Sequence, residues 1–403
     1  MLQYSERKIV AARVLERVLS LFKPIFLRTI PKSSRPVTAP VIVLIEPFHM
    51  GDVLSLAVMI DPLREHFPDA KILIWCNTEN SQIYKYDSRI HKTLHGPFPW
   101  SGRDSKRGTI SEWLAVLRSC WDMRTYRPDI AIDTRGDIRS QALMLLAGCP
   151  QRIGYSTYVA SNMRLRGLLL SHPLDDPTVQ HRYLRNLNTL RPLLGTVPEL
   201  RLPALSTERG QPPADHTSTI VLHPGAGWVF RRWDLARWAA LIGRLQQLPG
   251  VRIVLVAGPD EKELCKKLSE LLASPIETVE TTFQGLLETI AGASFFIGLD
   301  SGPMHAAVLM NVPVVALFGP GESHLWRPLS EGSETFHHIG DYPCHPCAQK
   351  LCARPFDSCM TRIEVEEVFQ AAVRVLGDSP GCHTSSLQSL ELSTVASSAP
   401  ILN

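Results

Sequence analysis

Residues 295–320 read FFIGLDSGPMHAAVLMNVPVVALFGP, and this stretch decides the fold. The apolar run 295–299 is typical of a strand buried on both faces, and residues 313–318 give a second such run. Between them, Asp300-Ser301-Gly302-Pro303 is typical of a helix start, and we expect a helix over 304–310. This compact unit predicts a right-handed parallel crossover. Its polar turn then lies at the carboxyl end of a strand, where open α/β sheets bind ligands.

The first half of the chain shows the same alternation. We expect strands at residues 41–45, 71–76, 128–133 and 152–155, with helices between them. The first strand runs into Met50-Gly51-Asp52, and a helix is expected over 53–60. Asp52 is then either a capping residue of that helix or a carboxylate at the end of the strand that can act as a general base. The spacing alone leaves both interpretations open.

Two further turns in the second half carry candidate ligands. The expected strand 219–222 leads into a turn with Gly225 and Gly227, followed by Arg231 and Arg232. This pattern is either a phosphate site, built from backbone amides and guanidinium groups, or a plain turn with solvated arginines. The strand expected at 251–257 leads to Glu261, which is either a ribose ligand or an acid that complements a helix dipole.

Four cysteines lie close together near the end of the chain. Cys344, Cys347, Cys352 and Cys359 fall within 16 residues. They suit a tetrahedral zinc site, but the spacing is irregular, so unligated thiols and disulfides stay open as alternatives. In each case we expect a structural role and not a catalytic one.

Length and charge bound the remaining possibilities. A chain of 403 residues predicts two domains. Residues 1–40 hold eight Lys or Arg and two Glu, which gives this segment a charge of +6. The net charge of the whole chain is +3, so the remaining residues carry −3. We therefore expect no nucleic-acid partner. The expected divisions are a basic amphipathic segment at 1–40, a first domain at 41–197, a linker at 198–218, a second domain at 219–360, a helix at 361–377 and a disordered tail at 378–403.

The N-terminal segment has apolar residues at helical spacing, but charged residues such as Glu16, Arg17 and Lys23 interrupt them. Its uninterrupted apolar runs are too short to span a bilayer, and the segment lacks the features of a signal peptide. We therefore expect a cytoplasmic protein. The helix either lies on an anionic membrane surface, at the inner face of the cytoplasmic membrane, or docks on its own protein.

Five stretches taken together resemble glycosyltransferase family 9, the bacterial ADP-heptose:lipopolysaccharide heptosyltransferases. They are MGDVL at 50–54, HPGAGWVFRRW at 223–233, AGPDEKE at 257–263, GLDSGPMHAA at 298–307 and VVALFGP at 314–320. The resemblance covers residues 41–377. It implies the α/β GT-B fold, two Rossmann-like domains with parallel sheets facing each other across a cleft. It also implies transfer of heptose from ADP-heptose to a lipopolysaccharide core or related glycan, with inversion and without a catalytic metal.

The resemblance also implies roles for individual residues. Asp52 becomes the base that deprotonates the acceptor, with Met50 and Gly51 on the acceptor side. Arg231 falls where the family usually has a lysine that holds the diphosphate, which leaves the exact donor open. The remaining donor-binding residues implied are Gly225, Gly227, Arg232, Glu261, Asp300, Ser301, Gly302, Met304 and His305.

Three alternatives compete with this interpretation. One is a GT-B transferase of another nucleotide sugar, and a second is a non-catalytic membrane-associated binding protein of the same fold. The third, a dinucleotide-dependent oxidoreductase, is the least favoured, because neither half shows G-x-G-x-x-G after its first strand.

Overall fold

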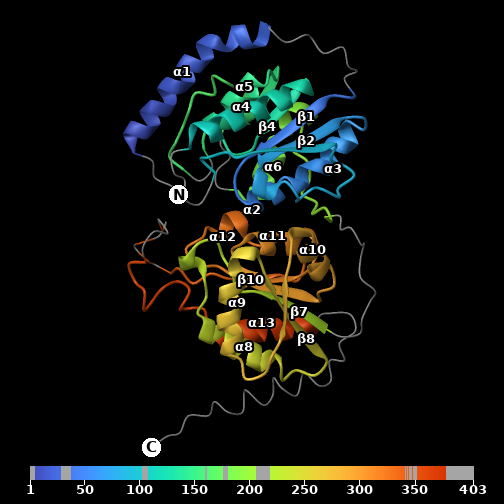
Figure 1. The fold of residues 1–403 in the computed structure, drawn as a ribbon, viewed down its shortest axis with the longest axis vertical. Coiled ribbons are helices and arrows are strands. Elements are labelled where there is room, and N and C mark those ends of the chain that lie inside the picture. The colour runs from blue at the N-terminus through green and yellow to red at the C-terminus, as the bar shows by residue number, and fades with distance from the viewer. Residues whose placement is uncertain are drawn as a thin grey trace, which may run out of the picture. The chain divides into compact units, whose positions relative to one another are not determined.

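The computed structural model describes residues 5–28, 38–101, 108–158, 161–175, 180–205, 218–340, 342, 344, 347 and 352–377. The chain divides into two compact units (Figure 1). The first comprises Met1–Glu208 with His324–Trp326, and the second comprises Arg209–Ser323 with Arg327–Asn403. The tail expected at 378–403, most of the expected linker and residues 102–107 lie outside the described residues.

The first unit is built on a six-stranded sheet in the order β3-β2-β1-β4-β5-β6, and every pairing is parallel. Its strands are β1 (Val41–Glu46), β2 (Lys71–Asn77), β3 (Lys92–Gly96), β4 (Ile130–Asp133), β5 (Gln151–Tyr155) and β6 (His172–Leu174). All six residues of β1 are buried, as its apolar run predicts. Because β1 and β4 are neighbours, their carboxyl ends lie side by side, and Ile45 pairs with Asp133.

Helices cover both faces of this sheet (Figure 1). The helices α4 (Ile110–Thr125) and α5 (Ile138–Leu146) share one hydrophobic core with β1 and β2. Around the rest of the unit lie α2 (Met50–Leu54), α3 (Ala57–His66), α6 (Arg182–Asn188), α7 (Arg191–Leu194) and the short η1 (Thr78–Asn80). The N-terminal α1 (Glu6–Arg28) packs against α5.

The second unit repeats the plan with strand order β12-β11-β10-β7-β8-β9, again all parallel. Its strands are β7 (Ser218–His223), β8 (Val251–Ala257), β9 (Glu277–Glu280), β10 (Phe295–Leu299), β11 (Val314–Leu317) and β12 (Glu334–Phe336). One core joins this sheet to α8 (Leu235–Leu245), α9 (Lys262–Glu270) and α13 (Val365–Gly377). The other helices are α10 (Phe283–Ala291), α11 (Gly302–Leu309), α12 (Ser323–Trp326), η2 (Val229–Arg231) and η3 (Pro259–Glu261).

The predicted parallel α/β architecture is confirmed in each unit, and the expected strand 295–299 matches β10. One expected helix was wrong. In place of a helix over 53–60, α2 begins at Met50 and ends at Leu54, and α3 starts at Ala57. Four strands were not predicted from the sequence: β3, β6, β9 and β12. They are the edge strands of the two sheets, short and partly polar, so they lack the apolar run that marks a buried strand.

Candidate functional site

Asp52 sits in the first turn of α2, which follows the carboxyl end of β1 after a three-residue turn. It is the third residue of α2 and completes a capping box with the N-cap residue His49, so the capping interpretation is confirmed and leaves a catalytic role open. Its Oδ2 accepts a hydrogen bond from the backbone N–H of His49 at 3.3 Å. The loop that carries His49 is held in place, because the side-chain amides of Asn77 and Asn80 both donate to the carbonyl oxygen of Phe48, at 2.8 and 2.7 Å. The carboxylate is therefore fixed at the carboxyl-terminal end of the sheet.

Arg135 is the main partner of Asp52. It follows β4, the neighbour of β1, and its Nη1 donates to Asp52 Oδ1 at 2.5 Å. Its Nε donates to Tyr158 Oη at 2.9 Å, and its guanidinium lies 3.9 Å from the ring centre of Phe48. Burial alone would raise the pKa of Asp52, but the charges of Arg135 and Arg182 hold that pKa below its ordinary value. Asp52 is thus ionised at neutral pH and has its Oδ1 aligned by a fixed cation.

A second ion pair, between Arg182 and Glu46, lies next to the pair of Arg135 and Asp52. Arg182 Nη2 donates to Glu46 Oε2 at 2.7 Å, and both side chains are almost fully buried. Arg182 also donates to the carbonyl oxygen of Thr134 at 2.9 Å, which joins α6 to the residue before Arg135. Burial and the nearby Asp52 charge raise the pKa of Glu46. The four side chains, two acids and two guanidinium groups, form one connected cluster at the carboxyl ends of β1 and β4.

In the second unit, the turn after β7 meets the helix after β8. Glu261 Oε2 lies 2.8 Å from Nε2 of His223 and accepts the backbone N–H of Gly258 at 2.9 Å. The other ring nitrogen of His223 is 3.3 Å from Ser301 Oγ. Although burial opposes it, the hydrogen bond to His223 and its charge lower the pKa of Glu261 to about 2. Gly225 is packed on this carboxylate, since a Cβ there would lie 1.9 Å from Glu261 Oε1.

Asp300 and Arg231 form an ion pair beside this group. Asp300 follows β10 and is buried, and its Oδ2 lies 2.7 Å from Arg231 Nη1. The two atoms are not aligned as a hydrogen bond, and within the described part of the chain Oδ2 accepts none of normal geometry. A buried carboxylate oxygen with accepting capacity left suits a sugar hydroxyl. The cation beside it suits a diphosphate.

The remaining predicted donor-binding residues lie around these groups or behind them. Gly227 and Gly302 are half-buried, and Arg232 donates its Nε to the carbonyl oxygen of Ala226 at 3.2 Å. Met304 and His305 are buried in the first turn of α11. On the acceptor side, Met50 and Gly51 are half-buried at the start of α2.

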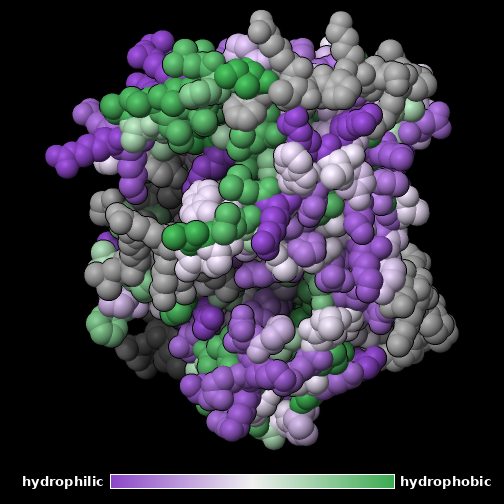
Figure 2. Space-filling view, turned by 45° about the horizontal axis from the view of Figure 1, so that its top comes forward, coloured by the Kyte–Doolittle hydropathy of each residue, from purple (hydrophilic) through white to green (hydrophobic). Residues whose placement is uncertain are grey.

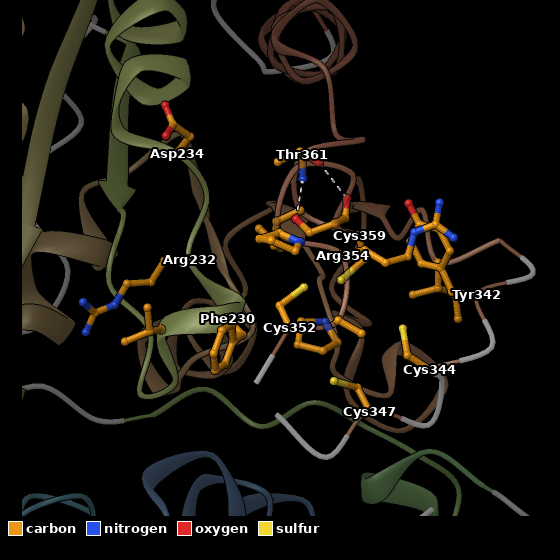
Figure 3. A pocket seen from close by; sticks show the side chains of 17 residues that line it. Phe230, Arg232, Asp234, Tyr342, Cys344, Cys347, Cys352, Arg354, Cys359 and Thr361 are labelled. Atoms are coloured by element: carbon orange, nitrogen blue, oxygen red, sulfur yellow. Dashed lines mark hydrogen bonds between the residues drawn. The ribbon is translucent and has the colours of Figure 1, made fainter. Parts of the chain in front are cut away.

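The four cysteines line one cavity of about 260 Å³ in the second unit (Figure 3). Cys344, Cys347, Cys352 and Cys359 are all free thiols. Burial and the neighbouring Cys347 and Cys352 raise the pKa of the Cys359 thiol to about 11. No three His, Cys, Asp or Glu side chains are gathered as a metal site among the described residues. The structural zinc stays a prediction.

Sequence reasoning missed Arg135, Glu46 and Arg182 in the first unit and His223 in the second. Only position gave a signal for them: Glu46, Arg135 and His223 stand at or just after the carboxyl ends of strands β1, β4 and β7. Arg182 gave none, because it reaches the cluster from a helix 136 residues further along the chain than Glu46.

Comparisons with known proteins bear on the family to which this chain belongs. The family model for glycosyltransferase family 9 (heptosyltransferase) matches residues 116–355. A lipooligosaccharide heptosyltransferase 2 of Campylobacter jejuni, serotype O:6, is 31% identical over 333 residues, which are 80% of this chain and 95% of that protein. The chain belongs to glycosyltransferase family 9. It is therefore a glycosyltransferase, and the family predicted from the motifs is confirmed.

Two further relatives agree with this assignment. The family 9 transferase is 27% identical to lipopolysaccharide heptosyltransferase 3 of Escherichia coli over 311 residues, 73% of this chain and 87% of that one. The solved structure of the E. coli ADP-heptose lipopolysaccharide heptosyltransferase II matches with a TM-score of 0.65 at 19% identity, covering 87% of this chain and 99% of that chain. This likeness supports the predicted fold of two Rossmann-like domains.

Proposed function

We propose that this family 9 transferase moves heptose from ADP-heptose to a lipopolysaccharide core or a related glycan, with Asp52 as the general base. The observation that carries the proposal is the Asp52 carboxylate itself: it is ionised, fixed at the end of β1, and aligned by Arg135. The heptosyltransferases that match most of this chain support the sugar and the acceptor class.

In the proposed step, Asp52 takes the proton of an acceptor hydroxyl. The hydroxyl oxygen forms a bond to the anomeric carbon of heptose, and the bond from that carbon to the β-phosphate oxygen breaks. ADP leaves with the bonding electron pair, and attack from the opposite face inverts the anomeric centre. The low pKa of Asp52 keeps it in the basic form over the whole neutral range, although it makes each proton transfer less favourable.

The second unit supplies the groups that suit the donor. Arg231 provides positive charge for the leaving diphosphate, and Arg232 and the start of α11 add to it. Asp300 Oδ2 suits a hydroxyl of the transferred sugar. Glu261 is an ionised acceptor at a strand end, which suits the ribose hydroxyls of adenosine. We place the reaction at the inner face of the cytoplasmic membrane, because the proposed acceptor is a lipid-linked glycan.

A donor screen on the purified full chain tests this assignment. Isothermal titration with ADP-heptose and with UDP- and GDP-linked sugars, followed by transfer assays on truncated lipopolysaccharide cores, should show binding and turnover with ADP-heptose. Arginine at position 231 replaces the lysine usual in the family, and this observation favours transfer of another nucleotide sugar as the second candidate. Turnover with a UDP- or GDP-sugar only would establish that candidate and refute the first.

A further inference from the structure

The N-terminal helix docks on the first unit through polar contacts. The Glu16 carboxylate is fully buried and accepts the backbone N–H groups of Arg166 and Leu168, at 3.0 and 2.8 Å. Lys23 Nζ donates to the carbonyl oxygens of Leu168 and Leu170, both at 3.3 Å. Apolar contact on this inner side is small and involves Ala12 and Leu19. The N-terminal helix is thus docked on its own protein, as one of the two interpretations predicts. Its outer face remains for the other interpretation, contact with a membrane surface.

That outer face is apolar. Its side chains recur at helical spacing opposite Glu16 and are exposed, Leu21 by 76% and Ile25 by 59%. Six of them are Val10, Val14, Val18, Leu21, Phe22 and Ile25. A surface helix of a globular protein normally turns its apolar stripe inward. The helix α1 does the reverse.

The helix α4 of the same unit also exposes apolar side chains. It buries Val116, Cys120 and Met123 against the sheet, as expected of a surface helix, and it exposes a second apolar stripe on another side. That stripe consists of Ile110, Trp113, Leu114, Leu117 and Trp121. Two of the five are exposed by more than two thirds, Ile110 by 81% and Trp121 by 68%.

Both α1 and α4 lie against α5: α1 through Ala12 and Leu19, and α4 through Arg124, whose Nη1 donates to the carbonyl oxygen of Leu146 at 3.2 Å. Figure 2 shows hydrophobic surface gathered at the upper left of the view, the side on which Figure 1 places α1. We call the eleven exposed side chains of the two stripes the α1–α4 face. Apolar patches of this extent on a soluble protein mark an interaction site.

Charge and residue type identify the occupant. The helix α1 carries six Lys or Arg and two Glu, and one of those Glu residues is buried. Arg7, Lys8 and Arg17 remain exposed. Basic side chains beside an apolar stripe are the pattern of helices that lie in the interface of anionic membranes. Trp113 and Trp121 add the residue that is enriched at the boundary between lipid and water. No described helix is long and apolar enough to cross a membrane.

We propose that the α1–α4 face is a docking surface for an anionic lipid bilayer. The two helices lie on the bilayer with their apolar stripes among the lipid headgroups and upper acyl chains, while the basic residues of α1 contact anionic headgroups. The first unit would then be held at the membrane without any spanning segment. The proposal concerns binding without substrates, so it stands or falls separately from the proposed transfer.

Co-sedimentation of the full chain with vesicles tests the surface. We expect binding to phosphatidylcholine vesicles with 30% phosphatidylglycerol, and at least tenfold weaker binding to pure phosphatidylcholine vesicles. Replacing one stripe with serines, as V14S/L21S/I25S or L114S/L117S/W121S, should lower binding at least tenfold. R7Q/R17Q should remove most of the preference for anionic vesicles. The matched control V197S/L271S/F356S removes three exposed apolar side chains elsewhere and should bind as the native chain does.

Two measurements keep the result interpretable. The circular dichroism and melting temperature of each variant should match the native chain, because only exposed side chains are changed. Tryptophan emission should shift to shorter wavelength with anionic vesicles and lose that shift in W113F/W121F. Equal binding to both vesicle types, equal losses in the control, or a dimer seen by light scattering that the stripe variants dissociate would each overturn the proposal. The dimer result would assign the face to a second copy of the chain.

Discussion

Arg135 and Asp52 stand 83 residues apart in the sequence, yet Arg135 Nη1 lies 2.5 Å from Asp52 Oδ1. Neighbouring parallel strands cause this contact, because β1 and β4 deliver both residues to the same edge of the sheet. Arg135 is therefore a positioning residue for the proposed base. It also sets the pKa of Asp52, since burial and the guanidinium charge act in opposite directions.

The pH dependence of transfer should report this relationship. In R135Q the charge is lost while burial stays, so the pKa of Asp52 rises and the acid limb of the kcat/KM profile moves to higher pH. R135K should move the limb back toward its native position. A limb that stays in place in R135Q, with folding intact, would show that Asp52 is not the group titrating in that limb.

Loss of the Arg231 charge should weaken donor binding. A charge-assisted hydrogen bond contributes about 1.5–3 kcal/mol, so R231Q should weaken ADP binding about 10- to 100-fold in isothermal titration. R231K should recover part of the affinity. The control R244Q breaks an exposed ion pair with Glu366 and should bind ADP normally. ADP affinity equal in R231Q and R244Q would remove Arg231 from the donor site.

Gly225 offers a steric test of the second unit. A Cβ at this position would lie 1.9 Å from Glu261 Oε1, so G225A must displace the carboxylate from His223. We expect ADP affinity to fall and the melting temperature to drop. G243A is the matched control, because no atom lies within 4 Å of its added Cβ and alanine is favoured inside α8 by about 1 kcal/mol. Unchanged ADP binding by G225A would contradict a donor role for Glu261.

The low pKa of Glu261 gives a stability signature. Its folded pKa of about 2 lies below the ordinary value of 4.5, so its contribution to the unfolding free energy is complete above 4.5 and declines as the pH falls toward 2. The native chain should therefore lose on the order of 2 kcal/mol more than E261Q between pH 6 and pH 3 in urea unfolding. Parallel pH curves for the two proteins would show that the carboxylate is not stabilised by His223 and Gly258.

Much of each fold was predictable because its central strands are buried on both faces. The runs at 41–45 and 295–299 are apolar throughout, the run at 251–257 is apolar except for Arg252 near its start, and each became a strand. The turns that carry the proposed donor-binding residues were predictable for the same reason, as Asp300 directly follows one such run and Glu261 stands four residues after another. Edge strands such as β9, with the sequence ETVE, have one partner and mostly exposed side chains, so their sequence carries no apolar signal.

The partners of the proposed catalytic groups were beyond the sequence. That Arg135 meets Asp52 depends on strand order, and that Arg182 meets Glu46 depends on where α6 lies. Whether an apolar stripe faces the core or the solvent could not be predicted from the sequence either. Trp113, Leu114, Leu117 and Trp121 occur at helical spacing whether that face points to the core or to solvent, and only the packing of Val116 and Met123 decides that it points outward.

The most direct test of the central claim is single-turnover transfer by D52N, measured beside its affinity for ADP. The side chains have nearly the same shape, but the amide cannot accept a proton. Transfer from ADP-heptose should fall on the order of 10²- to 10⁴-fold, while the ADP dissociation constant and the melting temperature stay close to native values. Transfer at the native rate by folded D52N would contradict the account, because the base would then be another group.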